Sequence, residues 1–125
     1  MNTKLIELLG LTLTCIVGKE GDDEIIFTTS CGQTFIMHHD QDCCESVYVD
    51  DIVGDLSDLI GWPILKAEES VSYDTFPIKG NRSADESFTW TFYHLATING
   101  YVDIKWLGSS NGYYSESVYF DKKQL

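Results

Sequence analysis

"SFTWTFYHLAT" at residues 87–97 and "INGYVDIKWLG" at residues 98–108 decide the fold class of this chain. Bulky apolar residues occupy alternate positions in both segments: Phe88, Trp90, Phe92, Val102, Ile104 and Trp106. Because successive side chains of a strand point to opposite faces, this pattern predicts two strands that each bury one face. Asn99-Gly100 lies between them and is a strong signal for a tight antiparallel hairpin.

A third strand is predicted at residues 113–120, after a second Asn-Gly pair at 111–112. The three segments predict an antiparallel meander with one aromatic face, which must be buried against the earlier strands or an N-terminal helix. The same alternation turns four tyrosines outward, as is typical of interfaces: Tyr93, Tyr101, Tyr113 and Tyr119.

The earlier part of the chain predicts shorter strands. Patterns rich in β-forming residues occur at 11–17, 24–30, 33–39 and 46–52, with Cys31-Gly32 as a tight turn between the second and third. Residues 63–74 start as a strand and then lose the pattern, and residues 75–85 are expected to form a long loop.

Two short helices complete the prediction. One ends at Gly10, and the other lies within residues 54–61, where Pro63 blocks its continuation. The fold class predicted is β-rich α+β, a twisted antiparallel sheet of meander, barrel-like or sandwich-like form. At 125 residues, with 43% hydrophobic residues, we expect a single domain over 1–125.

The charge is strongly acidic. Twenty acidic residues outnumber eight basic ones, which gives a formal net charge of -12. Because binding to phosphates depends on clustered Lys and Arg, we expect no direct binding to nucleic acid or to an anionic membrane. Such a surface suits a partner protein with a basic face, and homo-oligomerisation stays open.

The N-terminal segment predicts neither a secretory signal nor a membrane span. Glu7, Thr12 and Thr14 interrupt its apolar run, which falls short of the roughly 20 residues that a bilayer requires. In a cytosolic protein we expect all the cysteines as reduced thiols: Cys15, Cys31, Cys43 and Cys44. A bridge between the adjacent Cys43 and Cys44 is not expected, because it would strain the intervening peptide.

The stretch "HHDQDCCE" at residues 38–45 concentrates the chemistry of the chain. On a strand, His38, Asp40 and Asp42 would share one side and could offer three ligands to a hexacoordinate divalent ion. Adjacent cysteines diverge, so a zinc knuckle is not indicated. A catalytic pair could form between Cys43 or Cys44 and one of His38, His39 and His94, with Asp40 orienting the histidine base. No nucleophile-elbow or protease signature is present.

No cofactor is predicted. The chain has no Walker-type loop and no glycine-rich strand-to-helix fingerprint. Residues 108–114, "GSSNGYY", are predicted to be a hairpin turn whose amides could also line a small-molecule pocket with Trp106, Tyr113 and Tyr114.

Two longer blocks, residues 38–69 and 87–120, resemble a family of small proteins of unknown function encoded by tailed bacteriophages and prophages. The motifs that carry the resemblance are "HDQDCCE" at 39–45, "SFTWTFY" at 87–93 and "SNGYYSE" at 110–116. The resemblance implies a phage origin and the host bacterial cytoplasm, and it carries no established reaction. The candidate binding residues are His39, Asp40, Gln41, Asp42, Cys43, Glu45, Trp106, Ser110, Asn111, Tyr113, Tyr114 and Glu116.

Three functional hypotheses remain open. The first is a non-enzymatic binding protein that inhibits a host antiviral defence system, either by covering a basic surface of a host protein or nuclease complex or by sequestering a nucleotide-like immune signal. The second is a metal-dependent or thiol enzyme centred on residues 38–45. The third is a structural role in the virion. The first hypothesis is preferred because of the excess of acidic residues and the tyrosines expected at the surface.

Overall fold

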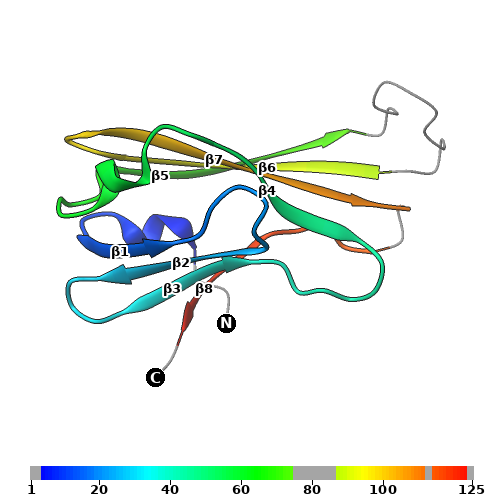
Figure 1. Cartoon of the computed structure of the whole chain (residues 1–125), viewed down its shortest axis with the longest axis horizontal. Coiled ribbons are helices and arrows are strands. Elements are labelled where there is room, and N and C mark those ends of the chain that lie inside the picture. The colour runs from blue at the N-terminus through cyan, green and yellow to red at the C-terminus, as the bar shows by residue number, and fades with distance from the viewer. Residues whose placement is uncertain (1–3, 75–86, 112–113, 124–125) are drawn as a thin grey trace.

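The computed structural model of this chain is a sandwich of two four-stranded antiparallel sheets (Figure 1). The structure describes residues 4–74, 87–111 and 114–123. One sheet has the order β1-β2-β3-β8 and the other β4-β7-β6-β5. The strands are β1 (Leu13–Val17), β2 (Glu24–Thr29), β3 (Thr34–His38), β4 (Ser46–Val53), β5 (Lys66–Asp74), β6 (Ser87–Thr97), β7 (Gly100–Ser110) and β8 (Tyr119–Lys123).

The predicted fold class is confirmed, and so are its two short helical segments. Each is a single 3₁₀ turn, η1 (Leu5–Leu8) and η2 (Leu56–Leu59). Asp55 caps η2 by accepting a hydrogen bond from the Ser57 amide at 2.9 Å. The long loop predicted at 75–85 lies outside the described residues.

The hairpin predicted around Asn99 is confirmed as the pair β6 and β7. These strands pair from Ser87 with Ser110 to Thr97 with Gly100, which leaves Ile98 and Asn99 in the turn.

The predicted phase of β6 is wrong from Trp90 onward, although Phe88 is buried as predicted. Tyr93 and Leu95 are fully buried, whereas Trp90 and Phe92 lie half-exposed on the outer face. Pairing sets Tyr93 opposite Ile104, and Leu95 opposite Val102, so they share the inner face with the buried residues of β7. A shift of one residue inverts every side chain of a strand, and alternation alone does not say which set is inward. Tyr101 is exposed as expected.

The predicted pairing of the third meander strand is also wrong. After β7 the chain crosses to the other sheet, where β8 pairs with β3 rather than with β7. The third meander strand is instead β5, which pairs with β6 over nine residues. Strand β5 lies at the edge of its sheet and pairs with a neighbour on one side only, and Glu68 and Ser70 face outward. This position explains why the hydrophobic pattern of residues 63–74 is weak.

The core lies between the sheets and is closed at one end by η1. Trp106 is fully buried, and its indole Nε1 donates to the Met37 sulfur at 3.1 Å, which links the two sheets. Phe120 stacks on Phe35 at a centroid distance of 5.4 Å and meets Phe27 edge-on at 6.0 Å. Across the described ranges, none of the helices has the length and apolar character that crossing a membrane requires.

Candidate functional site

Two connections between the sheets bring the two predicted motif blocks together. Residues 39–45 lead from β3 to β4, and residues 111–118 lead from β7 to β8. Since β3 pairs with β8, and β4 with β7, both connections cross between the sheets at the same end of the sandwich. We call residues 39–45 the first loop and residues 110–118 the second loop.

Glu45 organises the first loop from inside. Its carboxylate is buried and accepts hydrogen bonds from the Asp42 amide at 2.8 Å and the Cys43 amide at 2.9 Å. His39 Nε2 lies 2.8 Å from the same carboxylate. The Gln41 side-chain amide donates to the Glu45 backbone carbonyl at 2.7 Å. Four residues of the motif therefore converge on Glu45.

These contacts decide the ionisation of Glu45. Burial favours the neutral acid, but hydrogen bonds from the Cys43 amide, His39 and the Asp42 amide outweigh burial and lower the pKa of Glu45 to about 2. A carboxyl group with this pKa is ionised at neutral pH, so it holds no proton to donate as a general acid.

His39 joins the two loops. Its Nδ1 lies 2.6 Å from the backbone carbonyl oxygen of Ser117, in the second loop. Its Nε2 faces the Glu45 carboxylate, and the His39 side chain is almost completely buried. His39 thus contacts Glu45 in the first loop through one ring nitrogen and Ser117 in the second loop through the other, and this fastens the two loops together.

Glu116 organises the second loop in the same way. Its buried carboxylate accepts a hydrogen bond from the Thr89 hydroxyl at 2.8 Å and another from the Ser110 hydroxyl. The loop packs tightly on β7, because a Cβ at Gly108 would lie only 2.7 Å from the Cβ of Glu116. Both motifs therefore end in a glutamate whose role in this structure is to hold a loop.

The remaining candidate residues divide between core and surface. Asp40, Asp42, Cys43 and Asn111 are exposed on the loops, and Tyr114 is half-buried. Tyr113 lies outside the described residues. Trp106 lies in the core and not at the surface, which removes the main aromatic side chain of the pocket predicted with residues 108–114.

The expectation of reduced thiols is wrong for the adjacent cysteines. Cys43 and Cys44 form a disulfide on the exposed side of the first loop, whereas Cys15 and Cys31 are free. Glu45 binds the amides of Asp42 and Cys43, and this holds the peptide around the cysteine pair in a tight bend. A disulfide carries no thiolate, so in this form the pair supplies no nucleophile.

The proposed set of His38, Asp40 and Asp42 assembles only in part. His38 Nδ1 lies 3.5 Å from the Asp40 carboxylate, and His38 Nε2 pairs with Asp121 on β8 at 2.8 Å. Strand β3 ends at His38, and Asp42 lies in the loop that Glu45 folds. Within residues 4–74, 87–111 and 114–123, no group of three or more His, Cys, Asp or Glu side chains could hold a metal ion.

The outer face of the sheet β4-β7-β6-β5 carries aromatic side chains. The sequence-based prediction missed this face because it inverted the phase of β6. Phe92 and His94 stack with their ring centroids 6.3 Å apart, and Lys105 Nζ lies 4.3 Å from the ring centroid of Trp90. His94 pairs with Asp103 at 2.8 Å. The hairpin register, had it been combined with the burial of Val102, Ile104 and Trp106, would have predicted this face.

Comparison with known proteins gives a family without a function. A search of curated proteins and a search of solved structures found no match. The model of one protein family, described as "Domain of unknown function (DUF7448)", matches residues 6–120. That range includes both sheets except the end of β8, and both loops. The chain therefore belongs to the DUF7448 family of domains of unknown function.

Proposed function

We propose that this protein is a non-enzymatic binding protein that recognises a basic protein surface through its two joined loops. The observation that carries the proposal is the buried His39, which contacts Glu45 and Ser117 and so joins the two loops into one platform. Pre-organised loops lose little conformational entropy on binding, which favours recognition.

The chemistry of the platform favours binding over catalysis. The buried carboxylates of Glu45 and Glu116 are occupied by internal hydrogen bonds, and the Cys43–Cys44 pair is a disulfide. The charged side chains that the first loop exposes to solvent are Asp40 and Asp42. The whole chain has a formal net charge of -12. Opposite charge on a partner speeds encounter and fixes orientation.

The biological setting is proposed from the resemblance to phage proteins. In an infected bacterium, a small acidic protein that covers a basic surface of a host protein or nuclease complex would inhibit antiviral defence. Sequestration of a nucleotide-like signal is less favoured, because Trp106 lies in the core and the described loop surface carries acidic rather than basic side chains.

The test begins with affinity purification from bacterial lysate, followed by binding measurements with each purified partner at several salt concentrations. The variant Asp40→Asn/Asp42→Asn should weaken binding about tenfold, because two exposed charges are lost from the contact surface. The control Glu7→Gln/Glu68→Gln removes the same charge from η1 and β5 and should change affinity less than about twofold. Retention of no basic partner, or equal weakening by both variants, would contradict the proposal.

A further inference from the structure

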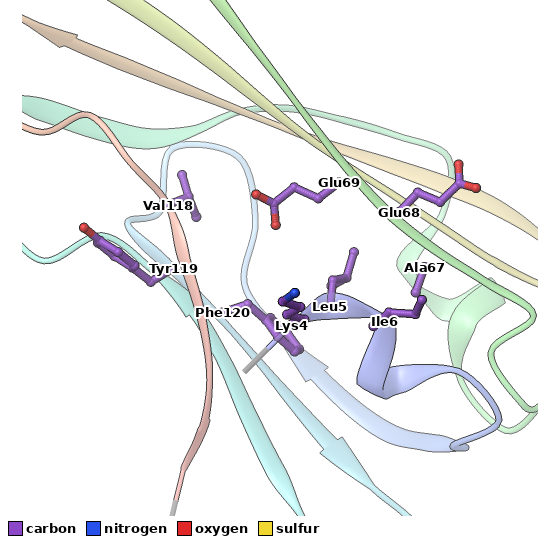
Figure 2. A pocket seen from close by; sticks show the side chains of 9 residues that line it. All are labelled: Lys4, Leu5, Ile6, Ala67, Glu68, Glu69, Val118, Tyr119 and Phe120. Atoms are coloured by element: carbon purple, nitrogen blue, oxygen red, sulfur yellow. The ribbon is translucent and has the colours of Figure 1, made fainter. Parts of the chain in front are cut away.

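A pocket of about 630 Å³ lies between the edge strands β5 and β8, beside η1 (Figure 2). It adjoins the second loop at the buried Val118, and none of the exposed residues of the two loops is among its lining residues. Its lining comes from three elements and the segment just before β8: Lys4, Leu5, Ile6, Ala67, Glu68, Glu69, Val118, Tyr119 and Phe120.

The walls of the pocket are mostly apolar. One carboxylate, that of Glu69, projects into the pocket from β5. Ala67 and Glu69 lie on the same side of β5, while Glu68 between them points the other way. Figure 2 shows the Glu69 carboxylate reaching toward Val118 across the pocket. Glu68 is paired with Lys66 instead, at 3.5 Å. Glu69 is therefore the acid that faces the pocket.

Glu69 lies in surroundings that disfavour its charge. Glu69 as a whole residue is exposed, but its neighbours partly desolvate the carboxyl group and raise its pKa. Directly opposite on β6 is Tyr93, whose hydroxyl is buried and has no hydrogen-bond partner among the described residues. Burial, and then the charge of Glu69, raise the pKa of Tyr93. A cation beside Glu69 would stabilise its ionised form.

We propose that this pocket binds a small aliphatic amine, whose ammonium group pairs with Glu69 and whose chain packs on Leu5, Val118 and Phe120. An apolar cavity with a single inward carboxylate matches a ligand that has an apolar body and one positive charge. The net charge of -12 attracts cations and repels carboxylates. Among the described residues that line the pocket, Lys4 is the single basic one, so an anionic ligand would find little compensation.

This inference goes beyond the proposed function and does not rest on it. The amine would occupy a pocket at the sandwich edge whether or not the two loops bind a basic protein. A variant that loses amine binding can therefore still be tested for binding of a basic protein, and the reverse also holds.

The probe is n-hexylamine at neutral pH, titrated by calorimetry and by NMR, with hexan-1-ol and hexanoate as ligands of equal chain length. We expect saturable binding of the amine with shifts at the Leu5, Val118 and Phe120 amides, and weaker binding of the other two. Glu69→Gln should lower amine affinity about tenfold, because the ammonium loses a charged partner. Glu24→Gln, the same change at an exposed position of β2 that does not line the pocket, should change it less than about twofold.

Three results would overturn the inference: no saturation by n-hexylamine, equal binding of the amine and hexanoate, or equal losses in Glu69→Gln and Glu24→Gln. Circular dichroism and thermal unfolding check that both variants fold. If Glu69→Gln does not fold, the preference of the wild-type protein for the amine over hexanoate decides the question.

Discussion

Two glutamates, Glu45 and Glu116, use their carboxylate oxygens inside the protein rather than at its surface. Each collects hydrogen bonds from its own loop or from the strand beneath, and each ends one of the two motifs. Their charge therefore contributes to loop structure, while the exposed Asp40 and Asp42 contribute to the surface. A pattern of acidic residues in sequence does not separate these two roles.

Glu45→Gln should lower the free energy of unfolding in a pH-dependent way. The pKa of Glu45 falls from 4.5 to about 2 on folding, so ionised Glu45 stabilises the fold fully above pH 4.5. That contribution is lost as pH falls through about 2. The difference between wild type and variant, measured by urea unfolding, should shrink between these pH values. Glu68→Gln is the control, and a pH-independent difference for Glu45→Gln would contradict the assignment.

Gly108→Ala should destabilise the protein by about 1–3 kcal/mol, because the added methyl group would press on the second loop. The predicted Cβ position lies 2.7 Å from the Glu116 Cβ and 2.8 Å from its carbonyl oxygen. Thermal unfolding of this variant is compared with Ser109→Ala, a change at the next residue that should stay within about 0.5 kcal/mol. Equal stabilities would show that the close approach at Gly108 is not needed.

Among the elements, η1 is short but closes the end of the sandwich. A single 3₁₀ turn has little stability of its own and depends on packing. Leu8 is fully buried, and the chain that follows is bonded to the segment before β5, with the Gly10 amide donating to the Ile64 carbonyl at 2.9 Å. The sequence predicted a short helix that ends at Gly10, but not the segment on which it packs.

Leu8→Ala should cost about 2–5 kcal/mol of unfolding free energy, because it leaves a cavity under η1. Leu9→Ala is the matched control. Leu9 is 42% exposed, so the same truncation there should cost less than about 1 kcal/mol. Chemical denaturation of the two variants measures the difference, and similar midpoints would mean that η1 does not seal the core.

At the scale of the whole molecule, the net charge of -12 opposes compaction through self-repulsion. Raising NaCl from about 0.05 M to about 0.5 M should therefore increase the urea midpoint, because the Debye length falls below the spacing of surface charges. The variant Glu7→Gln/Glu68→Gln carries two fewer negative charges and should show a smaller increase. An unchanged midpoint in wild type would indicate that the carboxylates are already compensated locally.

Residues 87–108 by themselves determined the β-rich class and the long hairpin, because alternation and a tight turn are local properties of the chain. Tertiary structure alone decided that β8 leaves the meander for the other sheet and that the two loops meet at His39. The pairing of distant segments depends on burial summed over the whole core, and no local pattern contains that sum. For that reason the motifs could be found in sequence, while their junction and the pocket beside Glu69 required the folded chain.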